Sequence, residues 1–308
     1  MGTTGRAFRR FRSFRRPGPL DPAGKLMIDW QRRFHQFAAR KEAEAVAADI
    51  APFTTEVDCA GADLAAIGND WSRQRFDGSW YLSRAASDDV PATSLVFVQS
   101  RDGNTGAKDP SALGGGEADK HLIYEGLSRV AADGVMAGAE TVRGGNIVLS
   151  TWHPELVALR QSLGLPRHPA QIVATLRGLT FEGLLFNVPE LRVILVTVGA
   201  CSDLMLTEIA DRSWITTVQM PTARDLPHAF RQLRRLGIGH ISCIGGRTLA
   251  RQMIDAGLTQ DLYLTTSPKD GGEPDTPLYP APLRSRLIVR KHGTGAEAGV
   301  VFEHLTLG

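Results

Sequence analysis

The sequence has few cysteines, and they are widely spaced. Three occur among 308 residues, at positions 59, 201 and 243. An odd number of distant cysteines builds neither a disulfide framework nor a local Cys-x-x-Cys metal site. We therefore expect a protein of a reducing compartment, the cytoplasm.

Long hydrophobic runs are also absent. No stretch of about 18 uncharged apolar residues exists, so we expect no membrane span. The most apolar run, residues 191–200, has the length of a buried strand. With 43% apolar residues, the chain is long enough to bury a substantial core in one large domain or two small ones.

Motifs for metal or nucleophilic catalysis are missing. The eight histidines never occur in a His-Glu-x-x-His spacing, and Gly-x-Ser-x-Gly does not occur. We therefore expect neither a metal ion nor a protein nucleophile. Hydride transfer from a bound nicotinamide needs neither of them, because the cofactor carries the reactive group.

The net charge of +2 conceals an asymmetry. Residues 1–16 contain six arginines and no acid, which leaves 29 basic against 33 acidic residues in the rest of the chain, a charge of −4. A mildly acidic body does not favour nucleic acid binding. Residues 1–26 are interpreted as a disordered basic leader, or as a segment upstream of a start at Met27.

Residues 27–92 are predicted to form an N-terminal helical and irregular extension. Trp30, Phe34, Phe37 and Ala38 share one face of a helix from Met27 to about Ala48, so this helix should pack on something. Its apolar face could extend a dimer interface or cover the core of its own chain.

The irregular part of the extension, residues 50–90, is rich in aromatic residues. Its Asp77-Gly78 step, between Phe76 and Trp80, predicts a hairpin turn. The aromatic residues could form a lid that stacks on a planar ligand, or could anchor the extension to the main core. We favour the anchor.

Strands and helices alternate after Pro91. Strands are predicted at 94–99, 134–137, 171–175, 191–198, 214–219, 240–244 and 262–266, and helices at 117–132, 154–163, 225–236 and 248–256. Such alternation predicts an α/β domain over residues 93–308, with a mostly parallel sheet covered by helices on both faces. Residues 286–290 and 300–305 lack an intervening helix and are interpreted as an antiparallel edge pair.

The sharpest local motif is Gly245-Gly246, where a strand turns into a helix. Glycine permits a tight turn, and the free N–H groups at the start of a helix attract an anion such as phosphate. Arg247 and the Thr248 hydroxyl add donors. The spacing fits neither a Rossmann fingerprint nor a P-loop. A strand-to-helix turn also requires glycine for structural reasons alone.

Two further loops follow predicted strands. Residues 100–104 (Ser-Arg-Asp-Gly-Asn) and 137–145 place polar and small residues where ligands of open α/β sheets collect. Asp102-Gly103 is equally typical of a simple turn. Gly114-Gly115-Gly116 opens a helix and could shape a pocket floor or be a flexible loop. Three polar loops on one sheet edge predict a binding site more strongly than any one of them.

Three segments together carry a resemblance. Ser100-Arg101-Asp102-Gly103, Ala139-Glu140-Thr141-Val142 and residues 245–249, followed by 256–258 and 261–262, occur in an order that resembles the reductase domain of bacterial riboflavin biosynthesis. That domain is the C-terminal part of a bifunctional deaminase-reductase and has a dihydrofolate reductase-like fold. The likeness spans roughly residues 93–306. The His-x-Glu and Pro-Cys-x-x-Cys signature of the deaminase domain is absent.

The resemblance implies an activity and a set of site residues. The family reduces 5-amino-6-(5-phosphoribosylamino)uracil with NADPH, and its members tend to be homodimers. The implied cofactor contacts are Thr141, Thr175, Gly245, Gly246, Arg247, Thr248 and Leu249. The implied substrate contacts are Ser100, Asp102 and Arg129. Arg129 is equally interpretable as a solvated helix arginine.

Three positions depart from the family pattern. Ile244 stands where the family has a glutamate, Gly145 replaces an acid, and Trp152 replaces an arginine. A pocket that loses hydrogen-bonding groups accepts a different molecule. The sequence therefore favours an NADPH-dependent reductase of a pyrimidine, pterin or related heterocycle with an unidentified proton donor.

Two other interpretations stay open. One is a non-catalytic nucleotide-binding or flavin-binding protein of the same fold. The other is a dihydrofolate or pterin reductase, which needs an acid near the start of the first helix of residues 93–308, where Glu117 and Asp119 lie.

Overall fold

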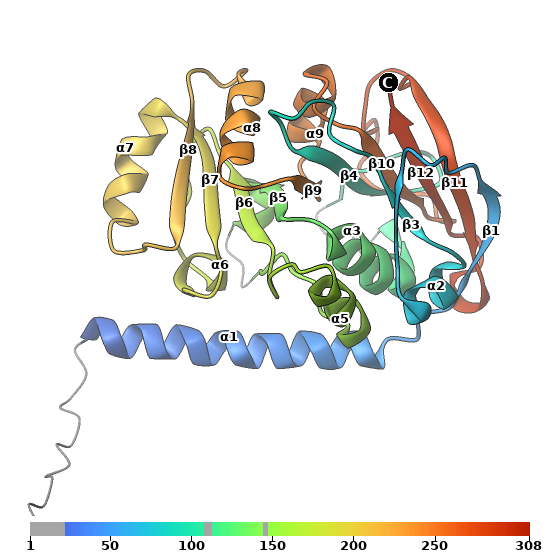
Figure 1. The fold of residues 1–308 in the computed structure, drawn as a ribbon, viewed down its shortest axis with the longest axis horizontal. Helices are drawn as coiled ribbons and strands as arrows, with labels where there is room; N and C mark the ends of the chain where they lie inside the picture. The colour runs from blue at the N-terminus through green and yellow to red at the C-terminus, as the bar shows by residue number, and fades with distance from the viewer. Residues whose placement is uncertain (1–21, 108–112, 144–146) are drawn as a thin grey trace, which may run out of the picture.

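The computed structural model describes residues 22–107, 113–143 and 147–308 (Figure 1). Its main element is a ten-stranded sheet in the order β1-β11-β12-β10-β4-β9-β5-β6-β7-β8. These strands are β1 (Phe53–Asp58), β4 (Ala92–Gln99), β5 (Gly134–Gly138), β6 (Ala170–Ala174), β7 (Val193–Val198), β8 (Ile215–Met220), β9 (His240–Cys243), β10 (Asp261–Thr266), β11 (Ser285–Gly293) and β12 (Val301–Leu307). The predicted leader, residues 1–26, lies mostly outside the described residues.

Seven neighbouring strands of this sheet, from β10 to β8, run parallel. The antiparallel part follows at one side, where β12 pairs with β10, β11 with β12, and β1 with β11. The predicted pairing of residues 286–290 and 300–305 is confirmed within it. β1 comes from the N-terminal extension and adds the outermost strand, which the sequence did not predict.

Helices cover both faces of the sheet. They are α1 (Pro22–Ala47), α2 (Asp70–Phe76), η2 (Ala118–Leu127), α3 (Ser128–Val130), α4 (Ala139–Val142), α5 (Pro154–Ser162), α6 (Leu184–Asn187), α7 (Gly199–Glu208), α8 (Leu226–Arg235), α9 (Arg247–Asp255) and the 3-10 turn η3 (Gly295–Glu297). Alternate residues of β5 point to opposite faces. Val135 joins the apolar cluster that contains Leu122 of η2, and Met136 joins the one that contains Phe230 of α8.

The predicted strands and helices of residues 93–308 are confirmed as elements, with ends that shift by a few residues. Gly164, Gly237 and Gly257, each just beyond a helix, have φ of 74°, 86° and 64°. That left-handed conformation is the one in which helices commonly end on glycine. The helix predicted at 117–132 is a π-helix, η2, that continues into α3, with a non-helical Gly126 inside it.

The N-terminal helix α1 packs on its own chain, beside α6 (Figure 1). Phe34 is 4% exposed and belongs to a cluster with Val148, Trp152 and Leu184. Trp30, Phe37 and Ala38 contact the same cluster and are partly buried. The prediction that this helical face packs on something is confirmed.

The hairpin predicted at Asp77-Gly78 is wrong. Asp77, with φ of 55°, ends helix α2, and Gly78 has φ of 131°. The same left-handed backbone that suits Asp-Gly in a hairpin also suits the end of a helix. The short strands β2 (Ala65–Ile67) and β3 (Trp80–Leu82) do pair, but α2 lies between them.

The aromatic residues of the extension anchor it to the main sheet. Phe76 and Trp80 are each 1% exposed. The Phe76 ring lies 5.1 Å from that of Phe302 on β12, and the Trp80 ring lies 4.1 Å from that of Tyr263 on β10. The favoured anchor is confirmed. Within the described residues, no helix is both long and apolar enough to cross a membrane.

Candidate functional site

The predicted site loops meet at one edge of the sheet. β4, β9, β5 and β6 are consecutive, parallel neighbours, so their carboxyl ends lie along the same edge. Ser100 follows β4, Gly245 lies just beyond β9, Thr141 lies just beyond β5, and Thr175 follows β6. Ligands of open α/β sheets bind at this kind of edge.

The glycine turn is open and close to Thr141. Gly246 has φ of 88°, which strains any side chain. A Cβ added to Gly245 would lie 3.1 Å from Oγ1 of Thr141, so the threonine hydroxyl faces the turn. The predicted cofactor residues after β9 and β5 therefore lie close together.

Helix α9 begins directly after this turn. Its first intrahelical bond runs from the Ala250 N–H to the Gly246 carbonyl at 2.9 Å, so the N–H groups of Arg247, Thr248 and Leu249 come before it. The first turn of α9 contains no acid. These N–H groups and the positive end of the helix dipole favour an anion.

The side chains of Arg247, Thr248 and Leu249 have different environments. Thr248 is exposed, and Arg247 is half-buried with a guanidinium nitrogen 3.9 Å from a carboxylate oxygen of Glu273. Leu249 is 8% exposed and packs in the cluster beneath α9. Leu249 can therefore offer an anion only its backbone N–H.

The polar residues after β6 and β4 stabilise their own loops. The Thr175 hydroxyl donates to the Gly178 carbonyl at 2.9 Å, and Thr175 is buried. The buried Ser100 hydroxyl donates to Asp102, and this bond holds the pKa of the exposed Asp102 below its ordinary value. The Asn104 N–H donates to Ser100 Oγ at 3.2 Å. The turn interpretation of this loop is supported, and Asp102 stays open to solvent.

Arg129 is the predicted site residue that the structure places differently. It is 2% exposed, so the interpretation as a solvated helix arginine is wrong. Its guanidinium donates to the Ser150 carbonyl at 2.8 Å and lies 4.6 Å from the centre of the Tyr124 ring. Because α3 leads into the beginning of β5, Arg129 lies toward the opposite end of that strand from Thr141.

Two of the three departures from the family pattern are core residues. Ile244 is 5% exposed, and its N–H donates to the Met136 carbonyl of β5. Trp152 is 1% exposed, and its ring lies 5.6 Å from that of Phe37 on α1. The tryptophan therefore packs against the N-terminal helix. Gly145 lies outside the described residues.

A pair of carboxyl groups lies near the start of η2: Asp119, which the sequence offered only for the dihydrofolate or pterin reductase interpretation, and Glu297, which it did not indicate. Asp119 is half-buried, and burial raises its pKa from 3.8 to about 6. A hydrogen bond from Thr265 of β10 opposes this rise in pKa, and the charge of Glu297 adds to it. Glu297 lies on η3, 178 residues further along the chain, so no local motif could reveal this contact.

The three successive glycines before η2 give space to this pair of carboxyl groups. A Cβ on Gly115 would lie 2.4 Å from an oxygen of Asp119, and one on Gly116 would lie 1.8 Å from an oxygen of Glu297. Gly114 and Gly116 have φ of 76° and 78°. Close side-chain contacts and backbone conformation thus account for these glycines, so a flexible loop is not required to explain them.

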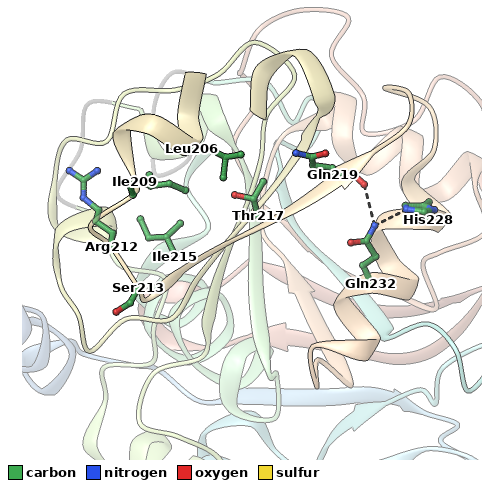
Figure 2. A pocket seen from close by; sticks show the side chains of 10 residues that line it. Leu206, Ile209, Arg212, Ser213, Ile215, Thr217, Gln219, His228 and Gln232 are labelled. Atoms are coloured by element: carbon green, nitrogen blue, oxygen red, sulfur yellow. Dashed lines mark hydrogen bonds between the residues drawn. The ribbon is translucent and has the colours of Figure 1, made fainter. Parts of the chain in front are cut away.

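A separate cavity of about 730 Å³ lies against β8, between α7 and α8 (Figure 2). Leu206, Ile209 and Ile215 line one part of it, and the Gln232 amide, hydrogen-bonded to His228, lines another. β8 is the outermost parallel strand, four strands from β9. This cavity is therefore distinct from the edge that carries the glycine turn.

Comparison with known proteins gives the family. Residues 91–297 match the family model of the RibD C-terminal domain. No curated protein matches the chain. A pyrimidine reductase-like protein of Corynebacterium diphtheriae is 20% identical, with a TM-score of 0.53 over 71% of this chain and 92% of that one.

Two named riboflavin proteins have a similar structure. Acinetobacter baumannii RibD is 17% identical, with a TM-score of 0.54 over 71% of this chain and 58% of that one. The riboflavin biosynthesis reductase Rib7 of Saccharomyces cerevisiae is 18% identical, with a TM-score of 0.50 over 71% of this chain and 91% of that one. These likenesses support the dihydrofolate reductase-like fold, and the family match over two thirds of the sequence shows that the chain belongs to the RibD C-terminal domain family of riboflavin-biosynthesis reductases.

Proposed function

We propose that the protein is an NADPH-dependent reductase that transfers hydride to 5-amino-6-(5-phosphoribosylamino)uracil or a closely related heterocycle. The observation that carries the proposal is the turn at Gly245 and Gly246, with the start of α9 behind it and the Thr141 hydroxyl beside it. Family membership supplies the reaction class.

The residues at this edge fit a dinucleotide. The pyrophosphate would lie on the N–H groups of Arg247, Thr248 and Leu249, beside two residues that carry no side chain. Arg247 is partly exposed and adds a positive charge. Thr141 would contact the cofactor from α4, and Thr175 from the end of β6. The bound cofactor supplies a hydride, and the protein supplies orientation and the exclusion of water.

The substrate would bind beside the β4 loop, with Ser100 and Asp102 as contacts. Asp102 is exposed and charged at neutral pH, so it can accept hydrogen bonds from amino or hydroxyl groups. Ile244 cannot accept such bonds, and Trp152 is packed against α1. We therefore propose a substrate that makes fewer polar contacts here than the family's usual pyrimidine does. Arg129 lies toward the opposite end of β5 and is bonded to the Ser150 carbonyl, so it is left out of this set of substrate contacts.

Turnover of a substrate panel tests this proposal. NADPH oxidation should depend on a ribosylaminopyrimidine, a dihydropterin or dihydrofolate added to the full-length protein. Thr141→Val should weaken NADPH binding, because it removes a hydroxyl at the turn. Thr216→Val, on the distant strand β8, is the matched control and should leave binding unchanged. NADPH binding that Thr141→Val leaves intact would argue against the placement of the cofactor.

A non-catalytic binding protein is the second candidate, and the apolar residues Ile244 and Trp152 favour it. It predicts that NADPH or a flavin binds while none of the panel is reduced. A dihydrofolate or pterin reductase is the third, and the carboxyl of Asp119, which stays protonated to about pH 6, favours it. It predicts that dihydrofolate or dihydropterin is the best substrate. The same panel therefore separates the three candidates.

A further inference from the structure

We propose that Glu273 is a positioning residue that holds the Arg247 side chain near the glycine turn and releases it to a phosphate when NADPH binds. The inference rests on the proposed reductase function and concerns how that site controls its own affinity. Glu273 lies in residues 267–284, the loop between β10 and β11.

This loop is fixed along α9. Arg247 and Arg251 are four residues apart, so their side chains lie on the same side of the helix. Arg251 donates to the Pro277 and Leu278 carbonyls at 2.7 and 2.8 Å. One turn earlier, Arg247 forms its ion pair with Glu273. The loop therefore brings Glu273 to the beginning of α9, where the anion would bind.

The backbone of Glu273 is held in place. Its N–H donates to the Gly106 carbonyl at 2.7 Å, and its carbonyl accepts the Thr276 hydroxyl. A Cβ on Gly106 would lie 3.0 Å from Oε2 of Glu273, so the glycine leaves room for the carboxylate. The same Oε2 lies 3.9 Å from Nη2 of Arg247. The carboxylate is therefore placed between the segment after β4 and the start of α9.

The guanidinium of Arg247 can change its partner. Among the described residues it makes this ion pair and no hydrogen bond, and the first turn of α9 contains no acid. The side chains of Arg247 and Glu273 are 31% and 57% exposed. Exposed ion pairs contribute little to stability, so the carboxylate is displaced easily. A phosphate at the start of α9 can form shorter, charge-assisted hydrogen bonds with the same guanidinium.

This exchange of partners has two opposing effects on the affinity for NADPH. Before NADPH binds, Glu273 keeps the positive charge of Arg247 near the turn, which preorganises the site. After NADPH binds, the carboxylate has lost its partner and stays near the negative phosphates, which opposes binding. The second effect should be larger, because the ion pair is long and exposed whereas the backbone of Glu273 is fixed. Glu273 therefore weakens the binding of NADPH.

Titration of the full-length protein with NADPH, followed by tryptophan fluorescence, tests the inference. At about 0.05 M salt, Glu273→Gln should lower the Kd for NADPH by about 3-fold to 10-fold, because it removes a negative charge beside the phosphates. At about 1 M salt, where the Debye length is about 3 Å, this difference should disappear. Glu273→Asp keeps the charge and should bind NADPH as the wild type does. Glu208→Gln removes the same charge at the end of α7, and as the matched control it should leave the Kd unchanged.

A double-mutant cycle shows whether Glu273 acts through Arg247. Arg247→Met should raise the Kd for NADPH, and in that background Glu273→Gln should lower it by less than about 2-fold. An equal gain in affinity in both backgrounds would overturn the role of Glu273 as a positioning residue. An unchanged Kd in Glu273→Gln at low salt would contradict this inference alone, whereas failure of the wild type to bind NADPH would contradict the reductase function as well.

Discussion

At the scale of single residues, Asp119 should cost stability at neutral pH. Its pKa is about 6 in the folded chain, against 3.8 for an unperturbed aspartate, so the folded state binds more protons between these values. The free energy of unfolding therefore falls as the pH rises through that window, and the cost is fully present above it.

We predict that Asp119→Asn raises the free energy of unfolding by about 1–2 kcal/mol at pH 7.5, after allowance for partial exposure. At pH 3.5 the two proteins should have similar stability, because Asp119 is then largely protonated in both states. Urea unfolding at the two pH values measures this. An equal gain in the free energy of unfolding at pH 7.5 and at pH 3.5 would show that removal of the Asp119 charge is not the cause of the stabilisation.

A second prediction at this scale concerns Gly116 and its matched control Gly164. The two glycines have φ of 78° and 74°. Nothing lies within 4 Å of a Cβ on Gly164, whereas Glu297 lies 1.8 Å from one on Gly116. Gly164→Ala should cost about 1–2 kcal/mol from its backbone alone. Gly116→Ala should cost at least about 2 kcal/mol more, from the clash and the displaced cap.

Thermal or urea unfolding of the two glycine variants gives the comparison. Equal costs would mean that Glu297 leaves the start of η2 without penalty.

Site residues divide by whether their signal is local. The turn at Gly245-Gly246 could be predicted because a strand, two glycines and a helix are adjacent in the sequence. Its contact with Thr141 followed once the two strands proved to be neighbours. The bond between Glu297 and the start of η2 joins residues 180 apart, and nothing near either residue indicates it. Burial of Arg129 also depends on distant Ser150, so the helical pattern alone left its environment open.

At the scale of elements, α1 packs on α6 and on the segment before α5. Phe34 is buried in the α1 cluster, and its ring lies 5.4 Å from that of His168. Burial lowers the pKa of His168 to about 4, so this contact is with a neutral imidazole at pH 7. Trp152 belongs to the same cluster, so this tryptophan and α1 pack together.

We predict that Phe34→Ala costs about 3 kcal/mol and exposes α1 to hydrogen exchange, because it removes a buried ring from the contact that holds the helix. Ile28→Ala, on the same helix at a side chain 51% exposed, is the control and should change stability by less than about 0.5 kcal/mol. Unchanged protection of α1 in Phe34→Ala would show that other contacts hold it.

Elements differ in how far they could be predicted. The parallel strands are buried on both faces, so their continuous apolar runs are clear in the sequence. β1 is an outer strand in which only Phe53 is fully buried, and its short run of threonine, glutamate and valine resembles a loop. The π-helical winding of η2 and the kink at Gly126 leave no periodic signal that a helix prediction would detect.

At the scale of the whole molecule, seven parallel strands bring the ends of β4, β9, β5 and β6 to one edge. The division into residues 27–92 and 93–308 stays a prediction, although β1 of the first part is hydrogen-bonded to β11 of the second. A homodimer also stays a prediction. Light scattering of the full-length chain should give twice 33.4 kDa, and a mass equal to one chain would contradict it.

The central claim is that this edge binds NADPH. Titration of the intrinsic tryptophan fluorescence of the full-length protein with NADPH and with NADH tests it most directly. The account predicts saturable binding of NADPH that is tighter than binding of NADH. Absence of binding by either nucleotide at millimolar concentration would contradict it.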